Sequence, residues 1–222
     1  AHQARDEGAD LVIFPELCVT GYPPMDLLMN PLFVDSVEAA VRAIAGEVPA
    51  DMGVILGTPV ENSNDVGKRL YNAALLLERG QVVDSVRKAL LPTYDVFDEY
   101  RYFEEGDARH VVEWRGKKIG LHVCEDMWNN EDQAPYHRYE ENPIENLGQQ
   151  GIDFFVNISA SPFHVGKYRV RGDIIRSICR QYNVPFIFVN TVGTNTEIIF
   201  DGESRVHSSD GTLLRCGATF EE

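Results

Sequence analysis

The chain has 222 residues, and 44% of them are hydrophobic, which is enough to build one sizeable core. Its 35 acidic residues outnumber its 20 Lys and Arg residues, so the formal net charge is −15. This balance argues against nucleic acid and anionic membranes as main partners, because both bind clustered cations.

The chain opens with "AHQARDEG", a pattern typical of the last turns of a helix that ends at Gly8. A strand is predicted directly afterwards, over residues 10–14. Because a helix of this kind usually follows another strand, we expect the first strand of the domain to be missing from this chain.

Further strands and helices follow along the chain. The Arg-Gly pair at 79–80 predicts a tight hairpin turn between two strands. In the last predicted helix, Ile174, Ile175, Ile178 and Tyr182 share one face. The remaining predicted strands are 53–60, 70–78, 81–88, 118–124, 153–159, 185–192, 196–202 and 204–209, and the predicted helices are 34–47, 141–151 and 168–183.

The mixture of these elements indicates the fold class. Strands, helices and hairpins are interspersed, and several strands are apolar on both faces, as expected for strands that are covered on both sides. We therefore predict sheets covered by helices, in an α/β or α+β layer fold that forms one domain over residues 1–222.

The cysteines and the hydropathy pattern indicate in which cellular compartment the protein is expected. Cys18, Cys124, Cys179 and Cys216 form no C-x-x-C pair and no metal-ligand spacing, which favours reduced thiols in a cytoplasmic protein without a metal site. No apolar run approaches the ~20 residues of a membrane-spanning helix, and no signal-peptide pattern is present.

Three predicted strands end in a polar residue that interrupts an apolar pattern. These residues are Glu16 just past Pro15, Lys88, and Cys124. Side chains at strand ends of layered α/β proteins often project into a shared cleft. Together they are chemically coherent: a carboxylate takes the thiol proton, the thiolate attacks a carbonyl, and an ammonium offsets the developing negative charge.

Each of these residues also has an ordinary structural interpretation. A lone cysteine after an apolar strand is usually a packing residue, a glutamate after proline is usually a turn or cap residue, and a lysine at a strand end is usually solvated. The spacing alone does not bring the three together.

Arg87 and Lys88 are adjacent, so strand alternation places them on opposite faces and only one can enter a site.

Four stretches, in chain order, resemble segments of the carbon–nitrogen hydrolase (nitrilase) superfamily, and in particular the glutaminase domain of glutamine-dependent NAD+ synthetases. They are "DLVIFPELCVTGYPPMDLL", "KALLPTYDVFDEYRYFEEG", "GLHVCEDMW", and "ISASPFHVGK" followed by "FVNTVGTNTEIIFDGES". They span most of the chain, from about residue 8 to about residue 205. The resemblance implies a nitrilase-type four-layer α-β-β-α sandwich.

The resemblance also implies roles for individual residues. Glu16 would be the general base, Cys124 the nucleophile that forms a thioester, and Lys88 the group that stabilises the tetrahedral intermediate together with the backbone N–H of Glu125. Glu99, in "FDEYRYF", would be a second carboxylate that orients Lys88.

A second set of positions would hold the substrate glutamine. These are Tyr94, Ser161 and Lys167, with the Glu125 side chain binding the amino group. The structural alternatives are a packed aromatic for Tyr94, a turn residue beside Pro162 for Ser161, and a solvated helix start for Lys167. Asp126, next to Glu125, is expected to cap the turn.

The implied activity is hydrolysis of the glutamine side-chain amide, without a metal or organic cofactor. The ammonia would serve ATP-dependent conversion of deamido-NAD+ to NAD+ in a C-terminal synthetase domain. No Gly-rich loop after a strand marks a nucleotide site in this chain, so ATP, Mg2+ and deamido-NAD+ are expected only in that absent domain. The expected partners are L-glutamine, the synthetase domain of the same polypeptide and further copies of the chain in a homo-oligomer.

Two other interpretations remain open at the level of the sequence. One is a stand-alone amidase of the same superfamily that acts on another small amide, although "GYPPMDLL" and "SPFHVGK" favour the synthetase branch. The other is a catalytically inactive interaction domain in which Cys124 only packs, although the complete Glu16, Lys88 and Cys124 set argues against it.

Overall fold

The computed structural model describes residues 1–129 and 139–221, and its strands form two main sheets. The first sheet has the order β1-β2-β3-β4, with β1 parallel to β2 and the other neighbours antiparallel. Its strands are β1 (Leu11–Ile13), β2 (Gly53–Glu61), β3 (Leu70–Glu78) and β4 (Gln81–Arg87).

The second sheet has the order β12-β11-β8-β7-β6-β5, and its central strands β6, β7 and β8 are parallel. A separate hairpin pairs β9 with β10. These strands are β5 (Val112–Trp114), β6 (Lys117–Val123), β7 (Phe154–Ser159), β8 (Phe186–Asn190), β9 (Val192–Asn195), β10 (Ile198–Asp201), β11 (Arg205–His207) and β12 (Leu213–Cys216).

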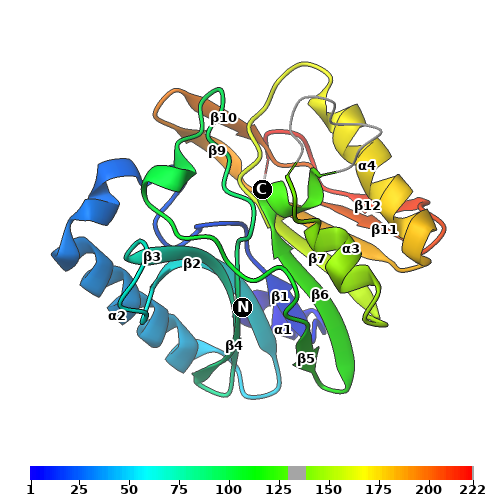
Figure 1. The fold of residues 1–222 in the computed structure, drawn as a ribbon. Coiled ribbons are helices and arrows are strands. Elements are labelled where there is room, and N and C mark those ends of the chain that lie inside the picture. The colour runs from blue at the N-terminus through cyan, green and yellow to red at the C-terminus, as the bar shows by residue number, and fades with distance from the viewer. Residues whose placement is uncertain (130–138, 222) are drawn as a thin grey trace.

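Helices cover the outer face of each sheet (Figure 1). Helix α2 (Pro31–Glu47) packs on the first sheet, whereas α3 (Pro143–Gly148) and α4 (Lys167–Tyr182) pack on the second. A third apolar cluster lies between the two sheets. This arrangement is the predicted four-layer α-β-β-α sandwich, so the fold prediction is confirmed. The short α1 (His2–Asp6) buries none of its residues.

Alternation along the buried strands builds these layers. In β2, Val54 and Leu56 pack against α2, while Ile55 between them packs in the cluster that separates the sheets. In β6, Ile119 and Leu121 join the same central cluster. Successive side chains of a strand point to opposite faces, so a strand covered on both sides must be apolar at consecutive positions.

Several predicted boundaries shift. Helix α2 begins at Pro31, three residues before the predicted start, because Asn30 caps it by accepting a hydrogen bond from Leu32 N (3.0 Å). The predicted hairpin at Arg79 and Gly80 is confirmed, with φ values of 51° and 79°. The strand predicted over 185–192 ends at Asn190, and β9 begins after a break at residue 191.

Strands β5 and β12 were not predicted.

Within the described ranges, no helix is long and apolar enough to cross a membrane.

Candidate active site

Three buried charged side chains meet at the end of the first sheet. Glu16 follows β1, Lys88 follows β4, and Glu99 starts the short helix η2 (Glu99–Arg101). Lys88 Nζ donates to Glu16 Oε1 (2.8 Å) and to both oxygens of Glu99 (2.7 and 2.8 Å). The fold thus brings two of the three predicted strand-end residues, Glu16 and Lys88, into direct contact.

Cys124 completes this cluster from the second sheet. It directly follows β6 and begins the helical turn η3 (Cys124–Met127), where its φ of 43° lies in the left-handed region. Such a conformation is uncommon for a residue with a side chain and is often found at functional sites. The side chain is 5% exposed, and its thiol is within electrostatic reach of Glu16, Lys88, Glu99 and Glu125.

Burial controls the ionisation of this cluster. It raises the pKa of the Cys124 thiol well above the ordinary value, Glu16 raises it further, and Lys88 opposes the rise. Burial alone would lower the pKa of Lys88, but Glu16 and Glu99 raise it well above its usual range. Burial also raises the pKa of Glu99 to about 7, against the opposing effect of Lys88. The resting site therefore holds a neutral thiol beside a charged lysine.

Glu125 carries a second carboxylate cluster beside the thiol. It is buried, and it accepts hydrogen bonds from the Tyr94 hydroxyl (2.9 and 3.0 Å to its two oxygens) and from the Tyr139 hydroxyl (3.0 Å). Burial, with Glu125 as the next cause, raises the pKa of both tyrosines, so both hydroxyls remain donors. The structure thus joins two predicted substrate positions, Tyr94 and Glu125, and adds Tyr139.

Ser161 and Lys167 are the two remaining predicted substrate positions. Ser161 is buried, and its Oγ has no hydrogen-bond partner among residues 1–129 and 139–221. Lys167 begins α4, and its Nζ lies 5.3 Å from the centre of the Trp128 ring. Burial lowers the pKa of Lys167, and Cys124 is the strongest opposing influence. Lys167 is therefore half-buried near the thiol and is not a fully solvated residue.

Arg87 and Lys88 separate as strand alternation requires. Arg87 stacks over the Tyr71 ring at 4.2 Å, away from the buried cluster, whereas Lys88 is fully buried in it. Asp126 binds backbone: it accepts from Val123 N (3.0 Å) at the start of η3, and from two N–H groups directly after Lys88. The structural role expected for Asp126 is confirmed, and the residue also ties the Lys88 segment to the Cys124 turn.

Sequence reasoning missed three groups that hold the carboxylates. The Asn72 side chain donates to Glu16 and Glu99, the Tyr22 hydroxyl donates to Glu99 Oε1 (2.8 Å), and the backbone N–H of Ala160 donates to Glu16 Oε2 (2.8 Å). A polar residue inside the apolar stretch "LYNAALLLE" was the available signal for Asn72.

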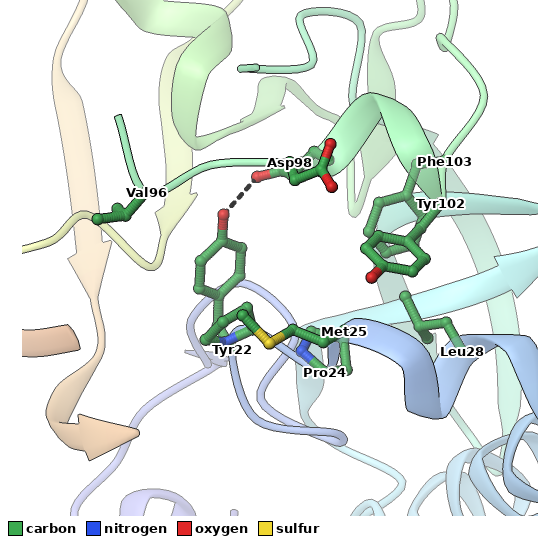
Figure 2. A pocket seen from close by; sticks show the side chains of 10 residues that line it. Tyr22, Pro24, Met25, Leu28, Val96, Asp98, Tyr102 and Phe103 are labelled. Atoms are coloured by element: carbon green, nitrogen blue, oxygen red, sulfur yellow. Dashed lines mark hydrogen bonds between the residues drawn. The ribbon is translucent and has the colours of Figure 1, made fainter. Parts of the chain in front are cut away.

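A small cavity of about 70 Å³ adjoins the cluster on the far side of Glu99. Figure 2 shows its lining, with Tyr22, Pro24 and Met25 on one wall and Tyr102 and Phe103 on another. The dashed line there is the hydrogen bond of the Tyr22 hydroxyl to Glu99. Glu99 therefore both lines the cavity and binds Lys88. Over the described parts of the chain, no group of three or more His, Cys, Asp or Glu residues is arranged to hold a metal ion.

Comparison with known proteins places the site in a family context. A family model described as carbon-nitrogen hydrolase matches residues 1–222. The glutamine-dependent NAD(+) synthetase of Synechocystis sp. is 41% identical over 225 residues, which cover 100% of this chain and 40% of that protein. The synthetase of the same name from Thermotoga maritima is 36% identical over 219 residues, 99% of this chain and 36% of that protein.

Solved structures give the same picture. The chain is similar to the glutamine-dependent NAD+ synthetase from Acinetobacter baumannii, solved in complex with ADP, with a TM-score of 0.87 and 34% identity over 100% of this chain and 39% of the other. An amidase from Nesterenkonia sp. has a TM-score of 0.77 and 21% identity over 97% of this chain and 76% of the other, a likeness in fold alone.

Proposed function

The chain belongs to the carbon–nitrogen hydrolase family, and we propose that its site hydrolyses the side-chain amide of glutamine through a thioester on Cys124. One observation carries the proposal: the buried ion pair of Glu16 and Lys88 lies within electrostatic reach of a buried thiol that begins a helical turn in a left-handed conformation. A packing cysteine needs none of these features.

Glu16 acts as the general base in this mechanism. A thiol with a strongly raised pKa does not ionise at rest, so its proton has to leave as the sulfur attacks. Glu16 Oε1 is held by Lys88, and Oε2 accepts one hydrogen bond from Ala160 N, which leaves this oxygen further acceptor capacity. The carboxylate takes the thiol proton while the S–C bond forms on the amide carbon.

Lys88 and the backbone N–H of Glu125 stabilise the oxyanion that results. When this intermediate collapses, the C–N bond breaks, Glu16 returns its proton to the nitrogen, and ammonia leaves. Water then attacks the thioester carbon, and Glu16 accepts a proton from the water. When this second intermediate collapses, the C–S bond breaks, Glu16 returns the proton to the sulfur, and glutamate and the free thiol are released.

Glu125 supplies the selectivity for an amino acid. A buried carboxylate that already holds two tyrosine hydroxyls is a strong partner for the α-ammonium group of glutamine. Ser161, whose buried Oγ has no partner in the described ranges, offers a further hydrogen bond, and Lys167 offers a cation for the α-carboxylate.

The chain spans about 40% of the length of the first relatives with which it was compared. We propose that the ammonia serves a synthetase domain of the same polypeptide, which amidates deamido-NAD+ to NAD+ with ATP, and that the protein assembles as a homo-oligomer in the cytoplasm. The name and the coverage of the relatives support the part of this proposal that concerns the synthetase domain.

The test measures ammonia and glutamate released from glutamine, together with acylation by an electrophilic glutamine analogue. Cys124→Ala should abolish release and labelling. Cys179→Ala, which removes an equally buried thiol outside the site, should retain both. Asparagine and acetamide serve as competing substrates. Label on a cysteine other than Cys124, or full activity of Cys124→Ala, would remove the nucleophile from the proposal, and a preference for acetamide would favour a stand-alone amidase.

A further inference from the structure

Asn72 lies at the centre of the buried charge cluster, in the interior of β3. Its side-chain Nδ2 donates to Glu16 Oε1 (2.7 Å) and to Glu99 Oε2 (3.3 Å). Its backbone carbonyl accepts from Lys88 N (2.8 Å). One residue therefore contacts both carboxylates through its side chain and holds the lysine through its backbone.

The hydrogen bonds of the two carboxylates can be counted. A carboxylate has about four lone-pair sites on its two oxygens. Glu99 receives four hydrogen bonds from the described residues, two from Lys88 and one each from Tyr22 and Asn72.

Glu16 receives three, from Lys88 and Asn72 at Oε1 and from Ala160 N at Oε2. Among the described contacts of both carboxylates, the spare acceptor site therefore lies on Glu16 Oε2.

We propose that Asn72 is a positioning residue, whose amide fills Glu16 Oε1 and Glu99 Oε2 and thereby leaves Glu16 Oε2 as the oxygen that takes the proton of Cys124. The inference rests on the proposed function, because it concerns the base of that reaction. Asn72 touches neither substrate nor thiol in this role. It acts through Glu16.

The local charge balance explains why an amide suits this position. Within residues 1–129 and 139–221, the ionisable groups that interact electrostatically with the two carboxylates include Lys88, the Cys124 thiol and the hydroxyls of Tyr22 and Tyr139. When both carboxylates are ionised they face one ammonium, so one negative charge is left for neutral donors to stabilise in a dry site. The amide group offers one N–H to each carboxylate without adding charge. A carboxylate at this position would add repulsion, and an apolar side chain would provide no donor.

The experiment compares Asn72→Leu and Asn72→Asp with the unchanged protein over a pH series. One measurement is kcat/KM for glutamine, and the other is the rate at which iodoacetamide alkylates Cys124. Without the amide, the ionised carboxylates lose a donor and accept a proton more readily. The acid limb of both profiles should move to higher pH by about one to two pH units in Asn72→Leu, and at least as far in Asn72→Asp.

Thr58→Val is the matched control. Thr58 is buried in the neighbouring strand β2, and its hydroxyl bonds only the Pro59 carbonyl among the described residues. This variant should leave both profiles in place. If the Asn72 variants are slower but keep an unshifted acid limb, Asn72 is merely structural and the inference is overturned.

The alkylation measurement separates this inference from the proposed function. If the unchanged protein does not hydrolyse glutamine, the proposed function fails, but the alkylation profiles still report whether Asn72 controls the base of Cys124. If glutamine is hydrolysed and both Asn72 variants keep the original profiles, only the inference fails. Asn72→Asp has nearly the shape of asparagine, so it provides a test even where Asn72→Leu folds poorly.

Discussion

Replacing Asp201 by asparagine should destabilise the protein strongly, although the change removes only a charge. Asp201 ends β10 and forms a fully buried ion pair with Arg171 of α4. The Arg171 guanidinium also lies 3.5 Å from the Gly202 carbonyl, and Asn190 Nδ2 donates to Asp201 Oδ1 (3.3 Å). In Asp201→Asn the guanidinium keeps its charge but has no other ion-pair partner among the described residues.

The expected loss follows from the burial of both partners. Removing one partner of a buried ion pair costs ~3–5 kcal/mol, because the other charge stays desolvated and uncompensated. For a domain of this size each kcal/mol lowers the melting temperature by ~2–4 °C, so Asp201→Asn should melt ~6–20 °C below the original protein. The double variant Arg171→Met with Asp201→Leu removes both charges and should lose less than the single variant.

Urea unfolding followed by circular dichroism measures these differences as free energies of unfolding. Glu38→Gln is the control, because it breaks the Glu38–Arg42 pair on the exposed face of α2, and it should cost below ~1 kcal/mol. If Asp201→Asn stays within ~1 kcal/mol of the original protein, the argument from burial is wrong. A double variant less stable than the single one would show that the pair contributes net stability beyond avoiding an unpaired charge.

Two further predictions concern pH and substrate. Burial lowers the pKa of His122 to about 4, so its neutral form stabilises the fold above its ordinary pKa of 6.5, and this contribution disappears as pH falls through 4. As pH falls from 6.5 to 4, the unfolding free energy of His122→Phe should decrease by ~3 kcal/mol less than that of the original protein. Equal decreases of both proteins in urea titrations over this pH range would contradict the assignment. Glu125→Gln should raise KM for glutamine ~10- to 100-fold and change kcat less. A fall in kcat at unchanged KM would move Glu125 from binding to chemistry.

Local sequence signals located most of the elements, and the misses have local causes. The Arg-Gly pair that predicted the turn at 79–80 recurs at Arg115 and Gly116, with φ values of 47° and 75°, where it joins β5 to β6. The same signal therefore marked β5, whose three residues are too few to show alternation. Strand β12 is exposed along its whole length, and its two adjacent leucines break the alternation of apolar and polar residues that marks a half-buried strand.

The site was predictable to the extent that it lies at strand ends. Glu16, Lys88 and Cys124 interrupt apolar patterns, which marked them as candidates, but their roles and the choice of Glu99 came from the family resemblance. Tyr22 reaches Glu99 across 77 positions of the chain, a contact that depends on the fold. Ala160 contributes only a backbone N–H group, so its residue type carries no signal of this contact.

In the proposed mechanism, Lys88 has to stabilise an oxyanion although its hydrogen-bond donors are already occupied. Its ammonium group has three N–H donors, and all three are used, one on Glu16 and two on Glu99. Lys88 can donate a hydrogen bond to a new negative charge only if one of these three bonds breaks. The two bonds to Glu99 end on the same carboxylate, so one can turn to the substrate while the other preserves the ion pair. Tyr22 and Asn72 hold Glu99 in place during this exchange. We therefore propose that the second carboxylate keeps Lys88 charged and also holds, until the intermediate forms, the donor that the oxyanion requires.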